Sequence, residues 1–401
     1  MNKNYLEQQF YCKDLFINEE YLDINYLPED ILHREQELII LSKIFIKLIE
    51  NPFKITRKLL IQGDVGIGKT AIARTFGIML KRSAEKRNIK IEVVHINCRK
   101  ERTHFKILQQ ILLTLSYPVP KRGFSPQELM TILQEYLEKN KIYLFLVLDE
   151  MNHIQSSDYD LIYALTRLND TTGKDSSFLS LLYIVRDITL LRNLDESTIS
   201  TLQGNILSLK KYNKMQINDI LEERINKSIQ KGVFPSKLTM IISEKIEDSG
   251  DIRKGLNIVR NAVKIAEIKD KTIVSYDEIH QAIKNLIPSL QDDALGILNM
   301  HQTIILFSIT TYFIENKEKR ITLNQLNPYY LNTCKKYDQL PRKSTQIWQN
   351  LQQLRNLNLI KIVTISKNMK GRKSFCSIND IPLNILNEEL NQKLKNFYCG
   401  R

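Results

Sequence analysis

The most constraining feature of this chain is a glycine-rich segment, GDVGIGKT at residues 63–70, that follows a short apolar run. The apolar run, KLLI at residues 58–61, predicts a buried strand. In such a loop the glycines let backbone N–H groups surround phosphate oxygens, Lys69 reaches the outer phosphates and Thr70 offers its hydroxyl to Mg²⁺. Residues 71–81 predict a helix whose amino-terminal end also faces the phosphates. The predicted nucleotide contacts are Asp64, Val65, Gly66, Ile67, Gly68, Lys69, Thr70 and Ala71.

An acidic pair completes the predicted site. Asp149 and Glu150 follow an uninterrupted apolar run at residues 142–148, IYLFLVL, as expected for a central parallel strand that is buried on both faces. Side chains at the carboxyl end of such a strand point into the ligand crevice. We expect Asp149 to hold Mg²⁺ together with Thr70, and Glu150 to orient the attacking water. Lys69, Asp149 and Glu150 are therefore predicted catalytic residues, and ATP or ADP with Mg²⁺ the predicted cofactors.

The formal net charge of +13 suggests a polyanionic partner. Residues 301–401 contain 16 Lys and Arg against 6 Asp and Glu, so the last quarter of the chain carries most of the excess. Localised positive charge is typical of a surface that binds nucleic-acid phosphates. The alternative is that a chain rich in Lys, Asn and Ile simply reflects genome composition.

The sequence contains no pattern that predicts a membrane span or an oxidising compartment. No apolar run reaches the ~18 residues of a membrane helix, and the first residues lack the layout of a signal peptide. The five cysteines are scattered without CxxC spacing, which argues against a disulfide framework and against a zinc site. We expect a cytoplasmic, nucleoid-associated protein with no membrane partner.

The basic last quarter has the pattern of a winged-helix domain. Its predicted elements are helices at residues 303–315 and 328–336, an extended piece at 320–323, and strands at 359–365 and 374–378. Ser344 predicts the N-cap of a further helix, in which Ile347, Leu351 and Leu354 form an apolar stripe. The segment KNMKGRK at residues 367–373 predicts a basic hairpin tip between the two strands.

In a winged-helix domain the capped helix enters the major groove and the hairpin tip follows a minor groove. Glutamine can bind adenine through two hydrogen bonds, although helix glutamines are also commonly solvated. A charged hairpin tip likewise either contacts DNA or is solvated. The predicted DNA contacts in this quarter are Arg342, Lys343, Gln346, Gln349, Lys367, Lys370, Arg372 and Lys373.

Five further segments resemble one protein family in their order and spacing. They are residues 28–35 (PEDILHRE), 96–105 (INCRKERTHF), 118–125 (PVPKRGFS), 160–170 (DLIYALTRLND) and 250–257 (GDIRKGLN). Together with the phosphate loop and the acidic pair, they make the chain similar to the archaeal origin-recognition/Cdc-six type DNA replication initiators, which are AAA+ ATPases. The resemblance implies an α/β AAA+ P-loop ATPase domain with a helical lid, followed by a C-terminal winged-helix domain. The implied boundaries are 1–25 for an N-terminal tail, 26–208 for the nucleotide-binding domain, 209–296 for the lid and 297–401 for the winged helix.

The resemblance also implies roles for single residues. Arg253 would approach the γ-phosphate from the lid as a further catalytic and nucleotide-binding residue, and Tyr212 and Arg224 would help to bind the nucleotide. By residue type alone, a helix tyrosine is usually a core residue and an arginine usually pairs with a carboxylate. Lys121 and Arg122 fall where the family has an insertion that touches DNA, and the same loop also fits a surface turn. The implied partners are double-stranded origin DNA, the replicative helicase and initiator paralogues.

Three departures from the family pattern bear on hydrolysis. Arg186 stands where the family has an asparagine after the fourth core strand, and Ser197 stands in place of a trans-acting arginine. Met151 and Asn152 follow the acidic pair, where the family has an apolar residue and Asp. An arginine that acts on a neighbouring subunit's nucleotide contributes roughly 10³–10⁵ in rate. We therefore expect secure ATP binding and slow turnover.

The predicted function is an ATP-dependent initiator that recognises replication origins and helps to load the replicative helicase, with the ATP and ADP states acting as a switch. One alternative is a weakly or non-hydrolysing DNA-binding regulator, that is, an accessory initiator paralogue. Another is an AAA+ adaptor of a mobile element or plasmid. Retained turnover would argue against the regulator, and sequence-specific DNA binding would argue against the adaptor.

Overall fold

The computed structural model describes residues 14–119, 123–154, 160–166, 177–186, 205–286, 295, 297–357, 359–366, 372–378 and 383–399. The chain divides into two compact units. The first, called the sheet unit below, is Asn25–Ile220 with Gly250–Arg253. The second, called the helical unit, comprises the segment that ends at Ile24, then Leu221–Ser249, and the chain from Lys254 onward.

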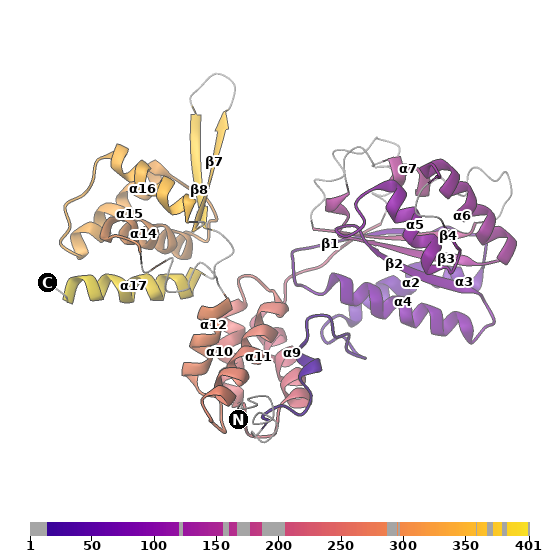
Figure 1. The fold of residues 1–401 in the computed structure, drawn as a ribbon, viewed down its shortest axis with the longest axis horizontal. Coiled ribbons are helices and arrows are strands. Elements are labelled where there is room, and N and C mark those ends of the chain that lie inside the picture. The colour runs from indigo at the N-terminus through magenta and orange to yellow at the C-terminus, as the bar shows by residue number, and fades with distance from the viewer. Residues whose placement is uncertain are drawn as a thin grey trace, which may run out of the picture. The chain divides into compact units, whose positions relative to one another are not determined.

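The sheet unit is built on a parallel sheet, drawn in Figure 1. In the described residues its strands are β1 (Lys58–Gln62), β2 (Ile91–Asn97), β3 (Tyr143–Asp149), β4 (Leu179–Val185) and β5 (Ile206–Ser208). Their order across the sheet is β2-β3-β4-β1-β5. Every residue of β3 and β4 is buried, which explains why these strands are apolar apart from Asp149 and Ser180, because helices cover both faces of the sheet.

Two helical layers enclose this sheet (Figure 1). One face is covered by α2 (Glu35–Phe45), α3 (Lys47–Glu50) and α4 (Lys69–Glu85). The other carries α5 (His104–Thr114), α6 (Pro126–Asn140) and α7 (Asp160–Thr166). Strand β3 divides its side chains between the two layers by simple alternation. Tyr143, Phe145 and Val147 join the core beneath α4, whereas Leu144, Leu146 and Leu148 join the core beneath α5 and α6.

The lid helices are α9 (Lys214–Ser228), α10 (Ser236–Ile246), α11 (Ile252–Ile268) and α12 (Tyr276–Leu286). Residues 14–24, which include the short 3-10 helix η1 (Glu19–Leu22), pack against them. Ile17 N–H donates to the Ser228 carbonyl at 2.7 Å, and the Leu22 side chain is fully buried. The part of the expected N-terminal tail that the structure describes is therefore held on the helical unit.

The C-terminal part of the helical unit has the winged-helix layout that the sequence predicts. Its elements are α14 (Met300–Asn316), β6 (Ile321–Thr322), α15 (Leu323–Lys336), α16 (Ser344–Asn356), β7 (Ile360–Ser366), β8 (Arg372–Ile378) and α17 (Leu383–Cys399). The antiparallel sheet has the order β6-β8-β7, and Cys376 lies opposite both Ile321 and Ile362. Pro328 lies inside α15, so this helix begins earlier than predicted.

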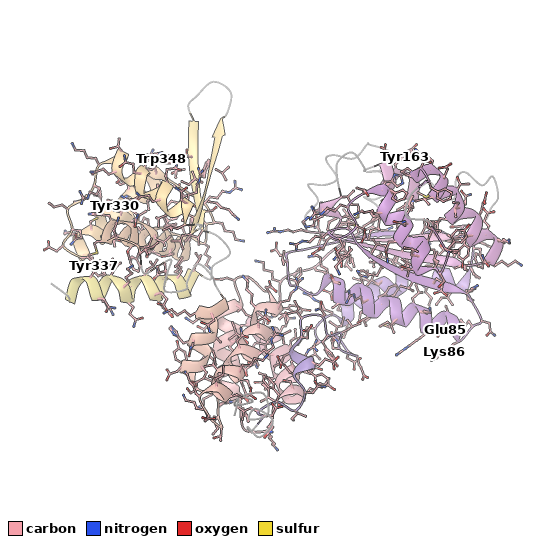
Figure 2. The ribbon with its side chains drawn as sticks, in the orientation of Figure 1. Glu85, Lys86, Tyr163, Tyr330, Tyr337 and Trp348 are labelled. Carbon is pink, nitrogen blue, oxygen red and sulfur yellow. The ribbon has the colours of Figure 1, made fainter. Side chains whose placement is uncertain are left out.

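Helix α16 carries the predicted apolar stripe, and Ile347, Leu351 and Leu354 are all buried. The predicted N-cap was displaced by one residue, because Lys343 occupies the cap and Ser344 is the first helical residue. The Gln346 side chain accepts a hydrogen bond from the Lys343 backbone N–H at 3.3 Å, which stabilises this start. Trp348 also lies on α16, where it is partly buried (Figure 2).

Helix α17 was not predicted from the sequence. Leu386, Leu390 and Leu394 form its buried stripe. Asn387 Nδ2 donates to Thr310 Oγ1 of α14 at 2.9 Å, and the Tyr337 hydroxyl donates to Asn391 Oδ1 at 2.8 Å. The helix therefore closes the side of the winged-helix core that α14 would otherwise leave open. None of the helices described is long and apolar enough to cross a membrane.

Candidate functional site

The carboxyl edge of the parallel sheet brings the predicted nucleotide-site residues together. The phosphate loop leaves the end of β1 and enters α4, while Asp149 is the last residue of β3. Strand β4 lies between β1 and β3, so the two motifs face each other across one strand. Ligands of open parallel sheets bind in the crevice outside the carboxyl ends of the strands.

The phosphate loop depends on glycine at two positions. Gly66 and Gly68 have φ angles of 78° and 91°, which lie in the left-handed region that glycine tolerates best. A Cβ atom on Gly66 would lie 1.8 Å from Asp251 Oδ1, and one on Gly68 would lie 3.0 Å from the Tyr212 hydroxyl oxygen. Ile67 between them is fully buried in the core beneath α4. The buried Ile67 side chain thus anchors the loop, and the Asp251 and Tyr212 side chains cover it.

The predicted metal ligands are already paired. Thr70 Oγ1 donates to Asp149 Oδ2 at 2.7 Å, and His95 Nε2 lies 3.1 Å from the same oxygen. Burial alone raises the pKa of Asp149, but the hydrogen bonds from His95 and Thr70 outweigh it, so the pKa lies below the ordinary value. Asp149 is only 1% exposed and is held as a carboxylate. A buried carboxylate beside a hydroxyl suits a hard divalent cation.

Lys69 lies over the loop in which it was predicted to act. Its ammonium group donates to the carbonyl oxygens of Gly63 and Asp64, at 2.6 Å each. Burial lowers the pKa of Lys69, Asp149 opposes that shift, and the positive charge of Arg253 adds to it. Arg253 is therefore within electrostatic range of Lys69, and its approach to the γ-phosphate remains a prediction.

The residues after the acidic pair are arranged by one hydrogen bond. Glu150 adopts a left-handed backbone conformation with φ 55° at the end of β3. Asn152 lies in the short 3-10 helix η2 (Met151–His153), and its Oδ1 accepts from the Arg186 backbone N–H at 2.7 Å. Arg186 directly follows β4, and its side chain is exposed. Asn152, a departure from the family pattern, thus ties together the ends of β3 and β4.

Arg34 is part of the site, although sequence analysis did not single it out. It is 4% exposed, and its Nη2 donates to the carbonyls of Ile67, at 3.1 Å, and Lys210, at 2.7 Å. Its guanidinium carbon lies 4.0 Å from the centre of the Tyr212 ring. Tyr212, predicted to bind nucleotide, thus lies beside the phosphate loop. The signal for Arg34 was its place in the segment at residues 28–35.

His95 was also overlooked. It precedes the segment at 96–105 that carries the resemblance, and alternation along β2 places it on the same face as Asn97. A polar side chain near the carboxyl end of a predominantly apolar strand was the available signal.

Arg253 and Arg224, the other two predicted nucleotide contacts, belong to different units of the chain. Ile252 N–H donates to the Gly66 carbonyl at 3.3 Å, so residues 250–253 join the sheet unit at the phosphate loop. Arg224 belongs to the helical unit, where its Nη1 donates to the Tyr21 carbonyl at 3.3 Å. The proposed role of Arg224 in nucleotide binding remains a prediction.

Only some of the predicted DNA contacts lie within the residues that the structure describes. Arg342, Lys343, Gln346 and Gln349 are exposed at the start of α16 and along it. Arg372 and Lys373 begin strand β8. Lys121, Arg122, Lys367 and Lys370 lie outside the described residues, as does Ser197.

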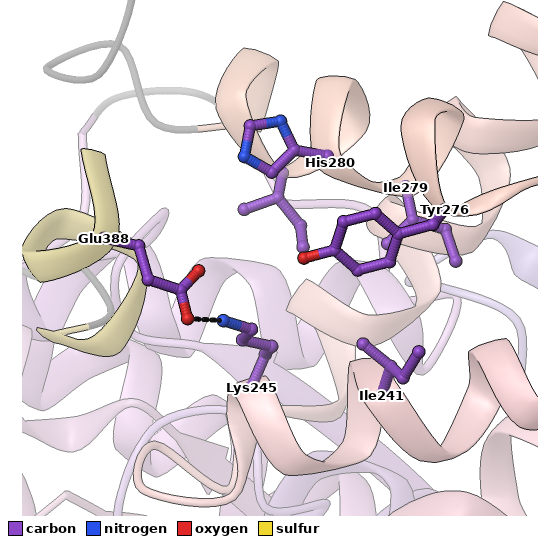
Figure 3. A pocket seen from close by; sticks show the side chains of 7 residues that line it. Ile241, Lys245, Tyr276, Ile279, His280 and Glu388 are labelled. Atoms are coloured by element: carbon purple, nitrogen blue, oxygen red, sulfur yellow. Dashed lines mark hydrogen bonds and ion pairs between the residues drawn. The ribbon is translucent and has the colours of Figure 1, made fainter. Parts of the chain in front are cut away.

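A small pocket in the helical unit is separate from these residues (Figure 3). Lys245 lies beside Glu388 there, with its Nζ 2.7 Å from Glu388 Oε1. The other lining residues are Ile241, Tyr276, Ile279, His280 and Ile283. None of the predicted nucleotide or DNA contacts lines it.

Comparison with known proteins separates the chain into recognisable parts. Residues 218–284 match the Cdc6 AAA+ ATPase-type lid domain, and residues 293–388 match the CDC6 C-terminal winged-helix domain. Residues 23–166 match the model of the bacterial TniB protein.

Similar structures share the whole fold. The Aeropyrum pernix ORC2 protein, solved in ADPNP–ADP complexes, has a TM-score of 0.66 at 22% identity, covering 96% of this chain and 99% of that one. The Aeropyrum pernix ORC1 protein, solved in complex with DNA, has a TM-score of 0.65 at 22% identity, covering 96% and 98%. These likenesses, together with the matches to the Cdc6 AAA+ ATPase-type lid and the CDC6 winged-helix domain, confirm the predicted α/β AAA+ fold with a lid and a winged helix.

A curated relative is similar over nearly its full length. ORC1-type DNA replication protein 2 of Saccharolobus solfataricus is 30% identical over 370 residues, which cover 90% of this chain and 89% of the relative. The paired Thr70 and Asp149 beneath the phosphate loop, the lid and the winged helix all agree with that likeness. The chain therefore belongs to the ORC1-type DNA replication protein family.

Proposed function

We propose that this protein is an ATP-dependent initiator of DNA replication that binds double-stranded origin DNA through its winged helix. The observation that carries the proposal is the hydrogen bond of 2.7 Å between Thr70 and Asp149 at the phosphate loop, in a chain that also has the winged-helix domain of its family. A preformed site of this kind suits a nucleoside triphosphate with its metal ion, and a winged helix suits duplex DNA.

The oxygens of Thr70 and Asp149 fit Mg²⁺. This cation keeps several waters and takes one or two carboxylates together with substrate phosphates. In the part of the chain that the structure describes, no group of three or more His, Cys, Asp or Glu side chains forms a closed metal cage. Thr70 and Asp149 would hold the ion, which supplies positive charge that neutralises the β- and γ-phosphates. Lys69 would bind the same phosphates, and Glu150 would orient the attacking water.

DNA recognition would divide between two features of the winged helix. The exposed Gln346 and Gln349 lie on α16, where they would meet base edges, and Arg342 and Lys343 would meet phosphates at its start. The basic hairpin between β7 and β8 would follow the backbone or a minor groove. Binding of nucleotide and of DNA within one chain supports a switch in which ATP and ADP states differ in DNA affinity and in recruitment of the replicative helicase.

Footprinting tests the initiator role. The purified, ATP-bound protein is applied at near-physiological salt to fragments that tile its own genome. We expect a few discrete protected sites in AT-rich intergenic DNA. A control protein with Lys69→Ala keeps the winged helix and should lose the ATP dependence of protection. Uniform weak binding that vanishes with modest salt would refute sequence-specific origin recognition and favour an AAA+ adaptor.

A weakly hydrolysing regulator is a second candidate, which one observation favours. Arg186 occupies the position after β4, and its backbone is tied to Asn152 by the hydrogen bond of 2.7 Å. An exposed arginine there replaces the asparagine that the family pattern has after the fourth core strand. Single-turnover hydrolysis separates the candidates: ATP that stays intact on the DNA-bound protein would support the regulator.

A further inference from the structure

His95 projects toward the predicted metal ligands from the neighbouring strand. In the register of β2 and β3, His95 lies opposite Val147 and Asn97 lies opposite Asp149. Paired residues of a parallel sheet project from the same face, and residues two apart on a strand share that face. The face is the one beneath α4, since a Cβ atom on Gly77 of α4 would lie 2.9 Å from Val93 Cγ1. His95, two residues further along β2 than Val93, therefore lies beneath the first turns of α4.

The hydrogen bonds indicate which ring nitrogen of His95 carries a hydrogen. Asp149 Oδ2 lies 3.1 Å from His95 Nε2 and accepts from Thr70 Oγ1 at 2.7 Å. An ionised carboxylate can only accept hydrogen bonds, so His95 Nε2 carries a hydrogen and donates it. Asp149 Oδ1 accepts from the Glu150 backbone N–H at 2.8 Å. Three donors thus converge on one carboxylate, and Oδ1 keeps a lone pair for a further partner.

We propose that His95 is a positioning residue for the Mg²⁺ ligands: its Nε2–H fixes the Asp149 carboxylate against Thr70, so that the hydrated ion on ATP meets two oxygens already in place. This inference rests on the proposed nucleotide site. Without the His95 donor, only the Thr70 hydroxyl and the Glu150 N–H hold the carboxylate, so the ion has to complete its ordering on binding. Loss of such an outer partner of a metal ligand typically lowers metal affinity by roughly 10–100-fold.

The burial of the pair explains why water does not replace the histidine. The Asp149 side chain is 2% exposed and the His95 side chain 18% exposed. His95 Nδ1 is buried and has no hydrogen-bond partner among the described residues, so no second hydrogen bond competes with Asp149 for the ring. The orientation of the imidazole is therefore set by packing under α4 and by the carboxylate.

The experiment measures ATP binding by the full-length protein, by equilibrium dialysis, across a series of MgCl₂ concentrations and in EDTA. The variant His95→Phe keeps the ring volume and removes the donor, whereas His95→Gln keeps an N–H donor at similar reach. Glu92→Gln on the same strand is the matched control, because Glu92 pairs with Lys81 and does not touch Asp149. Thermal melting in EDTA monitors folding. Should His95→Phe fail to fold, His95→Leu takes its place.

In His95→Phe we expect the half-saturating Mg²⁺ concentration to rise about 10–100-fold, with ATP affinity in EDTA unchanged. His95→Gln and Glu92→Gln should remain close to the wild type. An unshifted Mg²⁺ midpoint in His95→Phe would overturn the positioning role alone. An equal loss of ATP affinity with and without Mg²⁺ would also overturn it, because it would make His95 a packing residue of the loop. If wild-type ATP binding does not depend on Mg²⁺, the proposed metal site itself fails, and the inference with it.

Discussion

The substitution Arg34→Met removes a buried cation that joins the phosphate loop to the chain segment after β5. Arg34 Nη1 lies 2.9 Å from Glu37 Oε1, and Nη2 donates to the carbonyls of Ile67 and Lys210. Methionine retains most of the apolar stem but none of the donors. Glu37 then loses its cation, and two carbonyl oxygens lose a charged donor in a place where little water reaches them.

The magnitude follows from the burial of the partners. Removing one member of a buried ion pair costs roughly 3–5 kcal/mol. Because the Glu37 side chain is 16% exposed, water relieves part of its loss, and we expect the lower end, about 3 kcal/mol. For a unit of 150–250 residues, each kcal/mol shifts the melting temperature by about 2–4 °C. The expected fall in melting temperature is therefore about 6–12 °C.

Urea denaturation measures the free energy of unfolding of each variant. Thermal melting with and without ATP measures how far bound ATP raises the melting temperature. Arg34→Lys keeps the charge but loses the planar fork, so its loss should be intermediate. A double-mutant cycle with Tyr212→Leu should show a coupling of about 1 kcal/mol, because the guanidinium lies 4.0 Å from the ring centre. A loss below about 1 kcal/mol in Arg34→Met, or a strictly additive cycle, would refute the argument.

Three further predictions concern catalysis, DNA binding and the last helix. The native protein should hydrolyse ATP in multiple turnover at less than about 1 per second, and Glu150→Gln should abolish this residual rate while ATP binding persists; faster turnover would contradict the expected effect of Arg186 and Ser197. Replacing both Arg372 and Lys373 by glutamine should lower the salt slope of DNA binding by about 2, and an unchanged slope would remove them from the interface. Leu390→Ala in α17 should cost about 2–5 kcal/mol in unfolding free energy because the side chain is fully buried, whereas the exposed Lys395→Ala should cost little; equal melting curves would show that α17 does not support the winged-helix core.

Two parts of the candidate nucleotide site, the phosphate loop and the strand that ends in Asp149, were predictable because each is a short run of contiguous residues. A phosphate loop requires particular residues at particular spacings, and the observed φ angles of Gly66 and Gly68 show why. The apolar run that ends in Asp149 predicted a strand buried on both faces, and β3 is such a strand. Local patterns of this kind carry the same meaning in any fold that contains them.

Other residues could not be assigned without the folded chain. Arg34 is one polar residue among many before a helix, and its role depends on the Ile67 and Lys210 carbonyls, which are distant in the sequence. Asn152 interrupts the family pattern, and only the neighbouring end of β4 shows that its side chain binds the Arg186 backbone. Helix α17 differs from these residues, because Leu386, Leu390 and Leu394 recur at helical spacing like the stripe of α16, and only their packing against α14 required the folded chain.

The sequence by itself determined the phosphate loop, the acidic strand end, the concentration of positive charge in the last quarter and the order of the winged-helix elements. These depend on spacing, periodicity and composition, which a linear chain displays. The tertiary structure alone decided that His95 and Thr70 share one oxygen of Asp149, and that Tyr212 stacks on Arg34 beside Gly68. Such contacts arise from strand register and helix packing, which bring together side chains that the sequence keeps far apart.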